Sequence, residues 1–336
     1  FDAYVFGITA SPDDAYRYAK GDGILHPLGY EMKLREPLDF YSVTDHGFYM
    51  GMIQAFADTT TEISKKDFAK PFHDLNRKDN LTVESAGERS DLFSSIIGAV
   101  IAEPHPNWHP SMIKAWLTKN TQQALKSFDY DIHKSAWADI ARSANEHNDP
   151  GKFTTFIAYE YSPVLRDGGY NHRNVIFKNN TVPDRVFSLF DAHTAIDLWK
   201  KLLSSCNYPC EFMTIPHNGN RSWGVQFANQ TIDGDEYTDS DWELRDKYEP
   251  LVEMFQIKGN SECSTFFGST DEECNIEQIY PKCKKEGDTL CIQPTSMVRD
   301  ALKRGIELEE KLGFNPLDLG MIGSTDTHNS NPGDTE

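Results

Sequence analysis

Histidine and carboxylate side chains follow several short apolar runs that are typical of β-strands. The side chains are Asp45, His46, Glu160, His217, Asp326 and His328, and the runs before them span residues 38–44, 153–159, 212–216 and 319–323. Imidazole and carboxylate groups together suit zinc, manganese or iron in a site of more than one metal. Two metals about 4 Å apart can share a carboxylate and a hydroxide that attacks phosphorus or a carbonyl carbon. The pattern therefore predicts a catalytic metal centre.

Each of these residues also has a purely structural interpretation. A single histidine after a strand is more often a hydrogen-bonded loop residue, and Asp or Asn at such a place can cap a helix. His172 is an exception because it precedes the apolar run 175–177 instead of following one. The metal interpretation is favoured because several such residues share one structural context. Motifs for nucleotide-driven or serine-hydrolase chemistry are missing from the sequence.

Helical patterns separate the apolar runs. The first spans Pro12–Lys20, with Ser11 in the N-cap position and a proline at the first helical position. Apolar residues at three- and four-residue spacing predict further helices over residues 111–128, 132–147, 193–203 and 296–312. Strands that alternate with helices predict an α/β fold with a parallel sheet, whose loops gather the reactive groups at one end. Residues 221–295 are mostly polar and acidic, and we expect them to form insertion loops.

Composition excludes several classes of function. The chain has 336 residues, with 33 Lys and Arg against 52 Asp and Glu, which gives a formal net charge of −19. Nucleic-acid binding requires clustered cations, so we expect no nucleic-acid partner. The longest apolar run, Ile96–Ala102, is too short to span a bilayer, and we expect no membrane insertion. The composition is that of an acidic protein of the size of an enzyme.

The cysteines predict a secreted protein. They are Cys206, Cys210, Cys263, Cys274, Cys283 and Cys291. None forms a Cys-x-x-Cys pair, so structural disulfides are favoured over a zinc ribbon, with free thiols as the alternative. Pairs that are close in sequence, Cys206–Cys210 and Cys283–Cys291, are the simplest connectivity. Disulfides imply an oxidising compartment, a periplasm or the cell exterior.

Several motifs together resemble one family over nearly the whole chain. They are Asp13–Gly21, Val43–His46, His172–Phe177, Ile215–Asn220, Gln256–Gly259 and Gly323–His328. The sequence is identified by them as a member of the family called domain of unknown function 3604. That family is related to the polymerase and histidinol phosphatase (PHP) superfamily of metal-dependent hydrolases.

The resemblance implies a fold and three metal sites. The fold would be a distorted seven-stranded (β/α) barrel that forms a single domain over residues 1–336. The His-x-His motif of the first strand would lie before Phe1, and relatives also continue past the last motif. For the first metal, the implied ligands are Glu160, Asp326 and the two histidines of the His-x-His motif. For the second metal they are Glu160, His172 and His217. For the third they are Asp2, His46 and His328.

The expected activity is hydrolysis by two to three divalent metal ions, zinc, manganese or iron. We expect a phosphoesterase that acts on a small anionic ester through a hydroxide between the metals. Arg173 and Lys258 are candidates to bind substrate phosphate, with Asn218 and Asn220 as hydrogen-bond donors. One alternative is a hydrolase of an amide, lactone or glycosidic bond with the same metals. Another is a non-catalytic, metal-stabilised binding protein.

Overall fold

A computed structural model describes residues 2–26, 29–100, 119, 121–122, 124–285 and 287–333. Its α-helices are α1 (Asp2–Val5), α2 (Pro12–Ala19), α3 (Met52–Ala57), α4 (Ala86–Val100), α6 (Tyr130–His147), α7 (Ala195–Ser205), α8 (Asp239–Tyr248) and α9 (Val298–Leu312). Its strands are β1 (Ile24–Leu25), β2 (Glu31–Met32), β3 (Phe40–Tyr41), β4 (Thr154–Thr155), β5 (Ile157–Tyr161), β6 (Val164–Leu165), β7 (Gly169–Tyr170), β8 (Arg173–Phe177), β9 (Phe212–Pro216), β10 (Leu251–Gln256), β11 (Gly259–Asn260) and β12 (Gly320–Gly323). Most of the predicted helix over residues 111–128 lies outside the described residues.

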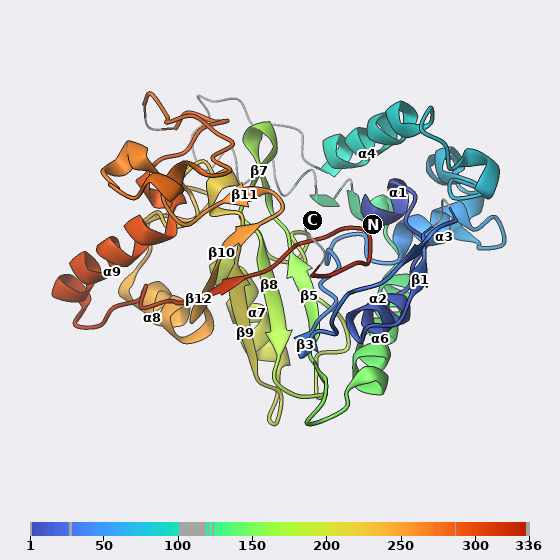
Figure 1. Cartoon of the computed structure of the whole chain (residues 1–336), viewed down its shortest axis with the longest axis horizontal. Coiled ribbons are helices and arrows are strands. Elements are labelled where there is room, and N and C mark those ends of the chain that lie inside the picture. The colour runs from blue at the N-terminus through green and yellow to red at the C-terminus, as the bar shows by residue number, and fades with distance from the viewer. Residues whose placement is uncertain are drawn as a thin grey trace.

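Two three-stranded sheets form the middle of the molecule. One has the order β5-β8-β9, and the other has the order β11-β10-β12. Strand β9 of the first sheet lies beside β10 of the second sheet, as Figure 1 shows. Helices α8 and α9 lie at one side of the sheets, and α2 and α6 lie at the other.

The expected seven-stranded barrel is wrong. The described residues form a mixed α/β fold with small sheets of two or three strands, and none of these sheets closes on itself. Among the strands of the described ranges, β3 pairs only with β4, and β12 pairs only with β10. A cavity of about 1580 Å³ lies in this region, lined by Val43, Ile176, Met213, Leu251 and Ile322 among others. Within the described part of the chain, no ladder crosses it to join β12 to β3.

The prediction of a parallel sheet also fails for the central strands. Strand β8 is antiparallel to both β5 and β9, and β3-β4 and β10-β12 are the only parallel strand pairs in the described part of the chain. The connection from β5 to β8 is the short hairpin β6-β7. A crossover between parallel neighbours needs a dozen or more residues, so this short connection forces the antiparallel arrangement.

Local sequence signals set the helix ends. The Ser11 hydroxyl accepts a hydrogen bond from the Asp14 backbone N–H, and the Asp14 carboxylate accepts one from the Ser11 backbone N–H, which is a capping box. Helix α9 ends at Gly313, whose φ of 80° is left-handed and favours glycine. Helix α6 packs Trp137 and Ile140 into the main core cluster.

Three disulfides join all six cysteines. Cys206 pairs with Cys210 and Cys283 with Cys291, which confirms the two pairs expected from the sequence. The third pair is Cys263 with Cys274. The last two disulfides cross-link the segment 221–295, which also contains α8 and β10. Such a set indicates an oxidising, extracytoplasmic environment. No helix in the described ranges combines the length and apolar character that crossing a membrane requires.

Candidate metal centre

The antiparallel sheet brings two of the predicted ligands to one edge. Arg173, the first residue of β8, lies opposite Tyr161 of β5 and opposite Pro216 of β9. His172 precedes β8 and His217 follows β9, so both histidines lie at the edge where β5 ends. His172 precedes its strand, but because β8 is antiparallel to its neighbours, His172 lies beside residues that follow theirs.

Glu160 lies at the middle of the cluster. Its Oε1 atom is 2.5 Å from Nδ1 of His172 and 3.5 Å from Nε2 of His217. The same oxygen is 3.5 Å from Nδ1 of His46, which reaches it from the loop after β3. An isolated parallel bridge between His46 and Glu160 fixes that loop against β5. One buried carboxylate thus contacts three imidazole rings from three segments of the chain.

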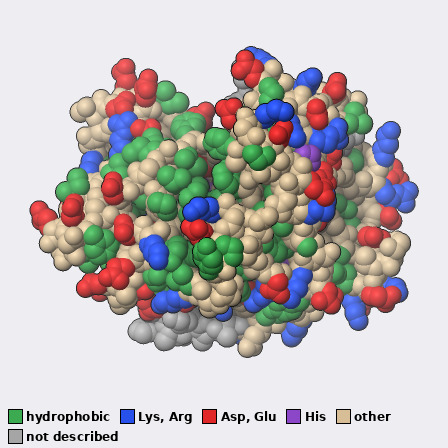
Figure 2. All heavy atoms as spheres, turned by 90° about the horizontal axis from the view of Figure 1, so that it is seen from below, with side chains coloured by type: hydrophobic (Ala, Val, Ile, Leu, Met, Phe, Trp, Pro, Cys, Tyr) green, Lys and Arg blue, Asp and Glu red, His purple; other side chains and the backbone are tan. Residues whose placement is uncertain are grey.

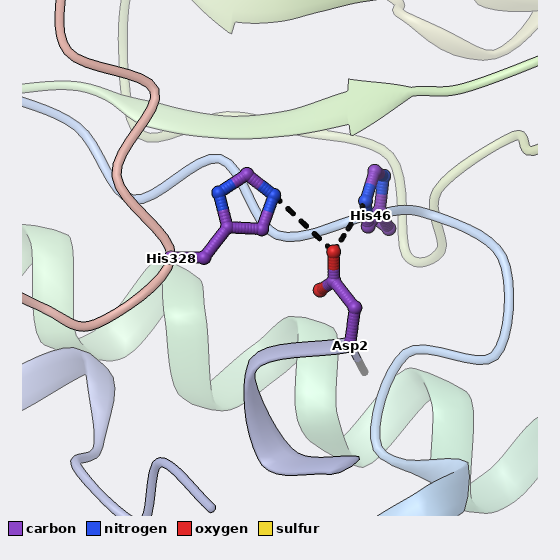
Figure 3. A group of neighbouring side chains, drawn as sticks. All are labelled: Asp2, His46 and His328. Atoms are coloured by element: carbon purple, nitrogen blue, oxygen red, sulfur yellow. Dashed lines mark hydrogen bonds and ion pairs between the residues drawn. The ribbon is translucent and has the colours of Figure 1, made fainter. Parts of the chain in front are cut away.

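A second carboxylate bridges two histidines at the side of this cluster. Asp2 Oδ2 lies 3.2 Å from Nε2 of His46 and 3.2 Å from Nε2 of His328. Figure 3 shows the Asp2 carboxylate between the two rings, which come from the loops after β3 and β12. These three residues are the set that the family resemblance implies for one metal.

The ligand-type atoms fall into overlapping groups, each within 4.8 Å. The groups are Asp2 with His46 and His328, His46 with Glu160 and His172, and Glu160 with His217 and Asp326. His46 belongs to two groups and Glu160 belongs to two, so the groups form one continuous cluster. Glu160, His172 and His217, implied as one ligand set, are divided between two of these groups.

Unpaired buried atoms fit a metal better than a closed hydrogen-bond network. His172 Nε2 and both ring nitrogens of His217 are buried and have no hydrogen-bond partner among the described residues. A buried polar atom without a partner costs about 1–3 kcal/mol. An imidazole nitrogen with a free lone pair and nearby carboxylates is the donor set of divalent transition metals. The residues present therefore fit divalent metal ions.

The electrostatics favour the metal-binding forms of Glu160 and His172 and the protonated form of His217. Although burial alone would raise the pKa of Glu160, the rings of His46 and His172 hold that pKa well below its usual range. Burial lowers the pKa of His172 to about 4, against the opposing effect of Glu160. Burial alone would lower the pKa of His217, but Glu160, Glu253 and Asp326 raise it to about 9. An ionised Glu160 and a neutral His172 are the forms that bind metals, whereas His217 must lose a proton before it can bind one.

The predicted substrate-binding residues divide into two places. Lys258 makes an ion pair with Asp326, and Asn218 Nδ2 donates to the same carboxylate at 3.4 Å. Asn220 lies behind them, where its Nδ2 donates to the Lys258 carbonyl at 3.0 Å. Arg173 points elsewhere: its buried Nε lies 2.6 Å from Oε2 of the buried Glu249.

Sequence reasoning missed one residue that contacts the cluster and one whose charge acts on it. Ser162 Oγ donates to Glu160 Oε1 at 2.9 Å and lies 2.5 Å from His46 Nδ1, so it joins two candidate ligands. The sequence offers a signal for Ser162: it lies two residues after Glu160, and residues two apart in an extended segment point to the same face. Glu253 is buried and accepts a hydrogen bond from the Ser324 hydroxyl. Its position inside the apolar run 251–257 had no distinguishing signal.

The fold and the site define a mixed α/β protein with a carboxylate-bridged cluster of histidines at one edge of its sheets. Residues 1–336 match the model of a family described as "Protein of unknown function (DUF3604)". The chain belongs to that family. Searches of curated proteins and of solved structures found no match to it.

Proposed function

We propose that this protein is a metal-dependent hydrolase, most simply a phosphoesterase of small anionic esters. The observation that carries the proposal is the position of the Glu160 carboxylate in two overlapping ligand groups. Shared ligands hold metals close together, as in sites that act on both the attacking and the leaving oxygen. The relationship to the PHP superfamily inferred from the sequence motifs supports the same class of reaction.

The side chains of the cluster have distinct roles in this proposal. Glu160 would be shared between two ions, with His172, His217 and Asp326 as further ligands, and His46 would bind one ion together with Asp2 and His328. Ser162 orients Glu160 and His46 through its hydrogen bonds. Divalent metals bound there lower the pKa of water and neutralise charge that develops on phosphate oxygens.

Two neighbouring polar side chains support an anionic substrate. Lys258 and Asn218 both contact the Asp326 carboxylate in this structure. If a metal ion bound the Asp326 carboxylate, the Lys258 ammonium and the Asn218 amide would be free to bind oxygens of the substrate. Because of the three disulfides, we propose that the protein acts in a periplasm or at the cell exterior.

Metal content and hydrolysis together test the proposal. We expect two or three transition metals per chain by inductively coupled plasma mass spectrometry, on protein purified without chelators. We expect turnover in a panel of phosphate monoesters and diesters, with amide, lactone and glycoside substrates in parallel. His217→Ala should abolish turnover and leave the circular dichroism spectrum unchanged, because His217 makes no hydrogen bond through its ring to other described residues.

A matched variant controls for loss of any histidine. His147 lies at the C-terminal end of α6 and contacts Asp13, away from the cluster. His147→Ala should retain both metal and turnover. Less than one metal per chain after soaking with manganese or zinc, or full turnover in His217→Ala with metal bound, would refute the proposal.

A further inference from the structure

Arg221 lies on an aromatic platform next to the metal-binding cluster. It ends the short 3₁₀ helix η6 (Gly219–Arg221), which follows His217 along the chain. Its guanidinium carbon is 4.1 Å from the ring centroid of Tyr170 and 5.9 Å from that of Tyr280. The Tyr170 ring stacks on the His172 ring, with centroids 4.4 Å apart.

Tyr170 places this cation at a defined distance from a candidate ligand. The guanidinium carbon lies 4.1 Å from the Tyr170 ring centroid, and the His172 ring centroid lies 4.4 Å from it. These two distances place the guanidinium carbon no more than about 8.5 Å from the centre of the His172 ring. That span suits a substrate that contacts the metals at one end and the guanidinium at the other.

Within the described residues, several arginines of this acidic protein pair with carboxylates, and Arg221 is not among them. Acidic and basic side chains are interspersed over the face seen in Figure 2. Arg142 contacts Asp13 and Arg299 contacts Glu262, for example. Arg221 has no carboxylate within 4.0 Å among the residues that the structure describes, and its buried Nε has no hydrogen-bond partner there. A guanidinium kept from acidic neighbours retains its donors for another anion.

The backbone around Arg221 is held in an unusual conformation. Asn218 and Trp223, on either side of it, have φ values of 58° and 52°. A left-handed conformation is costly for a bulky residue such as tryptophan, and such residues concentrate at functional sites. Trp223 packs edge-on against Tyr280, with ring centroids 5.0 Å apart. Gly169 permits this packing, since a Cβ there would lie 2.2 Å from Trp223 Nε1.

We propose that Arg221 is the specificity-determining residue that binds a phosphate group of the substrate from its Tyr170 platform. The inference rests on the proposed hydrolase function and assigns its substrate a phosphate within reach of Arg221. Guanidinium binds phosphate through two parallel N–H···O hydrogen bonds, which a lysine ammonium does not reproduce. The aromatic platform fixes the guanidinium plane, so little side-chain freedom is lost on binding.

Binding of inorganic phosphate tests this role. Isothermal titration calorimetry on manganese-loaded protein would compare wild type with Arg221→Gln and Arg221→Lys. We expect Arg221→Gln to weaken phosphate binding by about tenfold or more, and Arg221→Lys to fall between. Arg304→Gln is the matched control, because Arg304 lies on α9 and donates only to the Asn229 amide oxygen at 3.1 Å. Metal content and thermal midpoint should equal those of wild type in all variants.

The outcomes separate this inference from the proposed function. Equal phosphate affinity in Arg221→Gln and wild type would overturn the role of Arg221, as would a wild-type protein that binds no phosphate. Phosphate binding that depends on Arg221, without hydrolysis of any ester, would overturn the hydrolase proposal alone. If the chain binds no metal, the same titration on the metal-free protein still decides the role of Arg221.

Discussion

The carboxylate of Glu160 lies 2.5 Å from Nδ1 of His172, and both side chains are buried. Strands β5 and β8 are antiparallel, so a residue near the end of one strand meets a residue just before the other. Glu160 is also near His46 and His217, and it belongs to two groups of candidate ligands. We therefore expect metal binding at the cluster to depend on Glu160 more than on any peripheral ligand.

Replacement of Glu160 should remove more metal than replacement of a peripheral histidine. Glu160→Gln keeps the shape of the side chain and removes the charge shared by two groups, whereas His328→Ala affects only the group with Asp2. We expect a greater loss of metal per chain in Glu160→Gln, measured by inductively coupled plasma mass spectrometry. Glu211→Gln is the control, since Glu211 is an exposed partner of Lys178. Equal metal content in Glu160→Gln and wild type would refute a shared ligand.

Arg173 should matter for stability. Its guanidinium and the Glu249 carboxylate are both buried, and Arg245 contacts the other oxygen of Glu249 at 2.9 Å. Loss of one member of a buried ion pair costs about 3–5 kcal/mol. We therefore expect Arg173→Met to lower the free energy of unfolding by about 3–5 kcal/mol in urea denaturation. Arg142→Met, on the surface of α6, should change it little.

The same variant decides between two roles for Arg173. A structural ion pair predicts that Arg173→Met, where folded, binds inorganic phosphate as wild type does. If phosphate binding is lost while the free energy of unfolding is unchanged, the expectation from the sequence that Arg173 binds substrate would hold.

Much of the secondary structure follows from local patterns. The runs 212–216 and 319–323 correspond to β9 and β12, and the helical pattern over residues 132–147 corresponds to α6. Their signals are local, because apolar spacing and caps act within a few residues of the chain. The two disulfides that are closest in sequence were predictable for the same reason.

The arrangement of these elements was not predictable in the same way. Strand direction depends on the connection, and the two-residue strands of the β6-β7 hairpin carry little sequence signal. The family resemblance pointed to the right family and to the wrong fold for the described residues. Arg173 meets Glu249 only because β8 packs near the end of α8, a contact between residues far apart in the chain.

The position of Asp2 should depend on Arg89. The buried Arg89 guanidinium donates to the carbonyls of Val5 and Leu75, each at 2.6 Å, and to Asn76 Oδ1 at 2.9 Å. It thereby fixes α1, the helix that begins with Asp2. Hydrogen bonds from a charged group contribute about 1.5–3 kcal/mol each. We expect Arg89→Met to lower the free energy of unfolding by about 3 kcal/mol and to speed hydrogen exchange in residues 3–8.

The loss should extend to the metal-binding cluster. Arg89→Met should lower metal content in the same way as Asp2→Asn, because both changes affect the group of Asp2, His46 and His328. Metal content equal to that of wild type, together with faster exchange in α1, would show that this group binds no metal.

His133 should make stability depend on pH. Its ring is buried, Nε2 donates to the Gly47 carbonyl at 2.9 Å, and Nδ1 has no partner among the described residues. Burial lowers the pKa of His133 below its usual value, against the opposing effect of the hydrogen bond to Gly47. The unfolded chain, with an ordinary histidine pKa, therefore binds a proton first as the pH falls. The free energy of unfolding decreases as the pH falls through that ordinary value, and His133 contributes to this decrease.

A comparison with His133→Gln isolates this contribution. Glutamine can donate to the Gly47 carbonyl and does not titrate, so the variant retains the contact without the pH dependence. Urea denaturation between about pH 7.5 and about pH 5.5 should show a steeper fall for wild type than for His133→Gln. The free energy of unfolding of wild type, relative to that of His133→Gln, should be highest at the upper end of this pH window, because His133 is neutral there in both the folded and the unfolded state. Parallel curves over the window would mean that the buried ring takes up a proton as readily as in the unfolded chain.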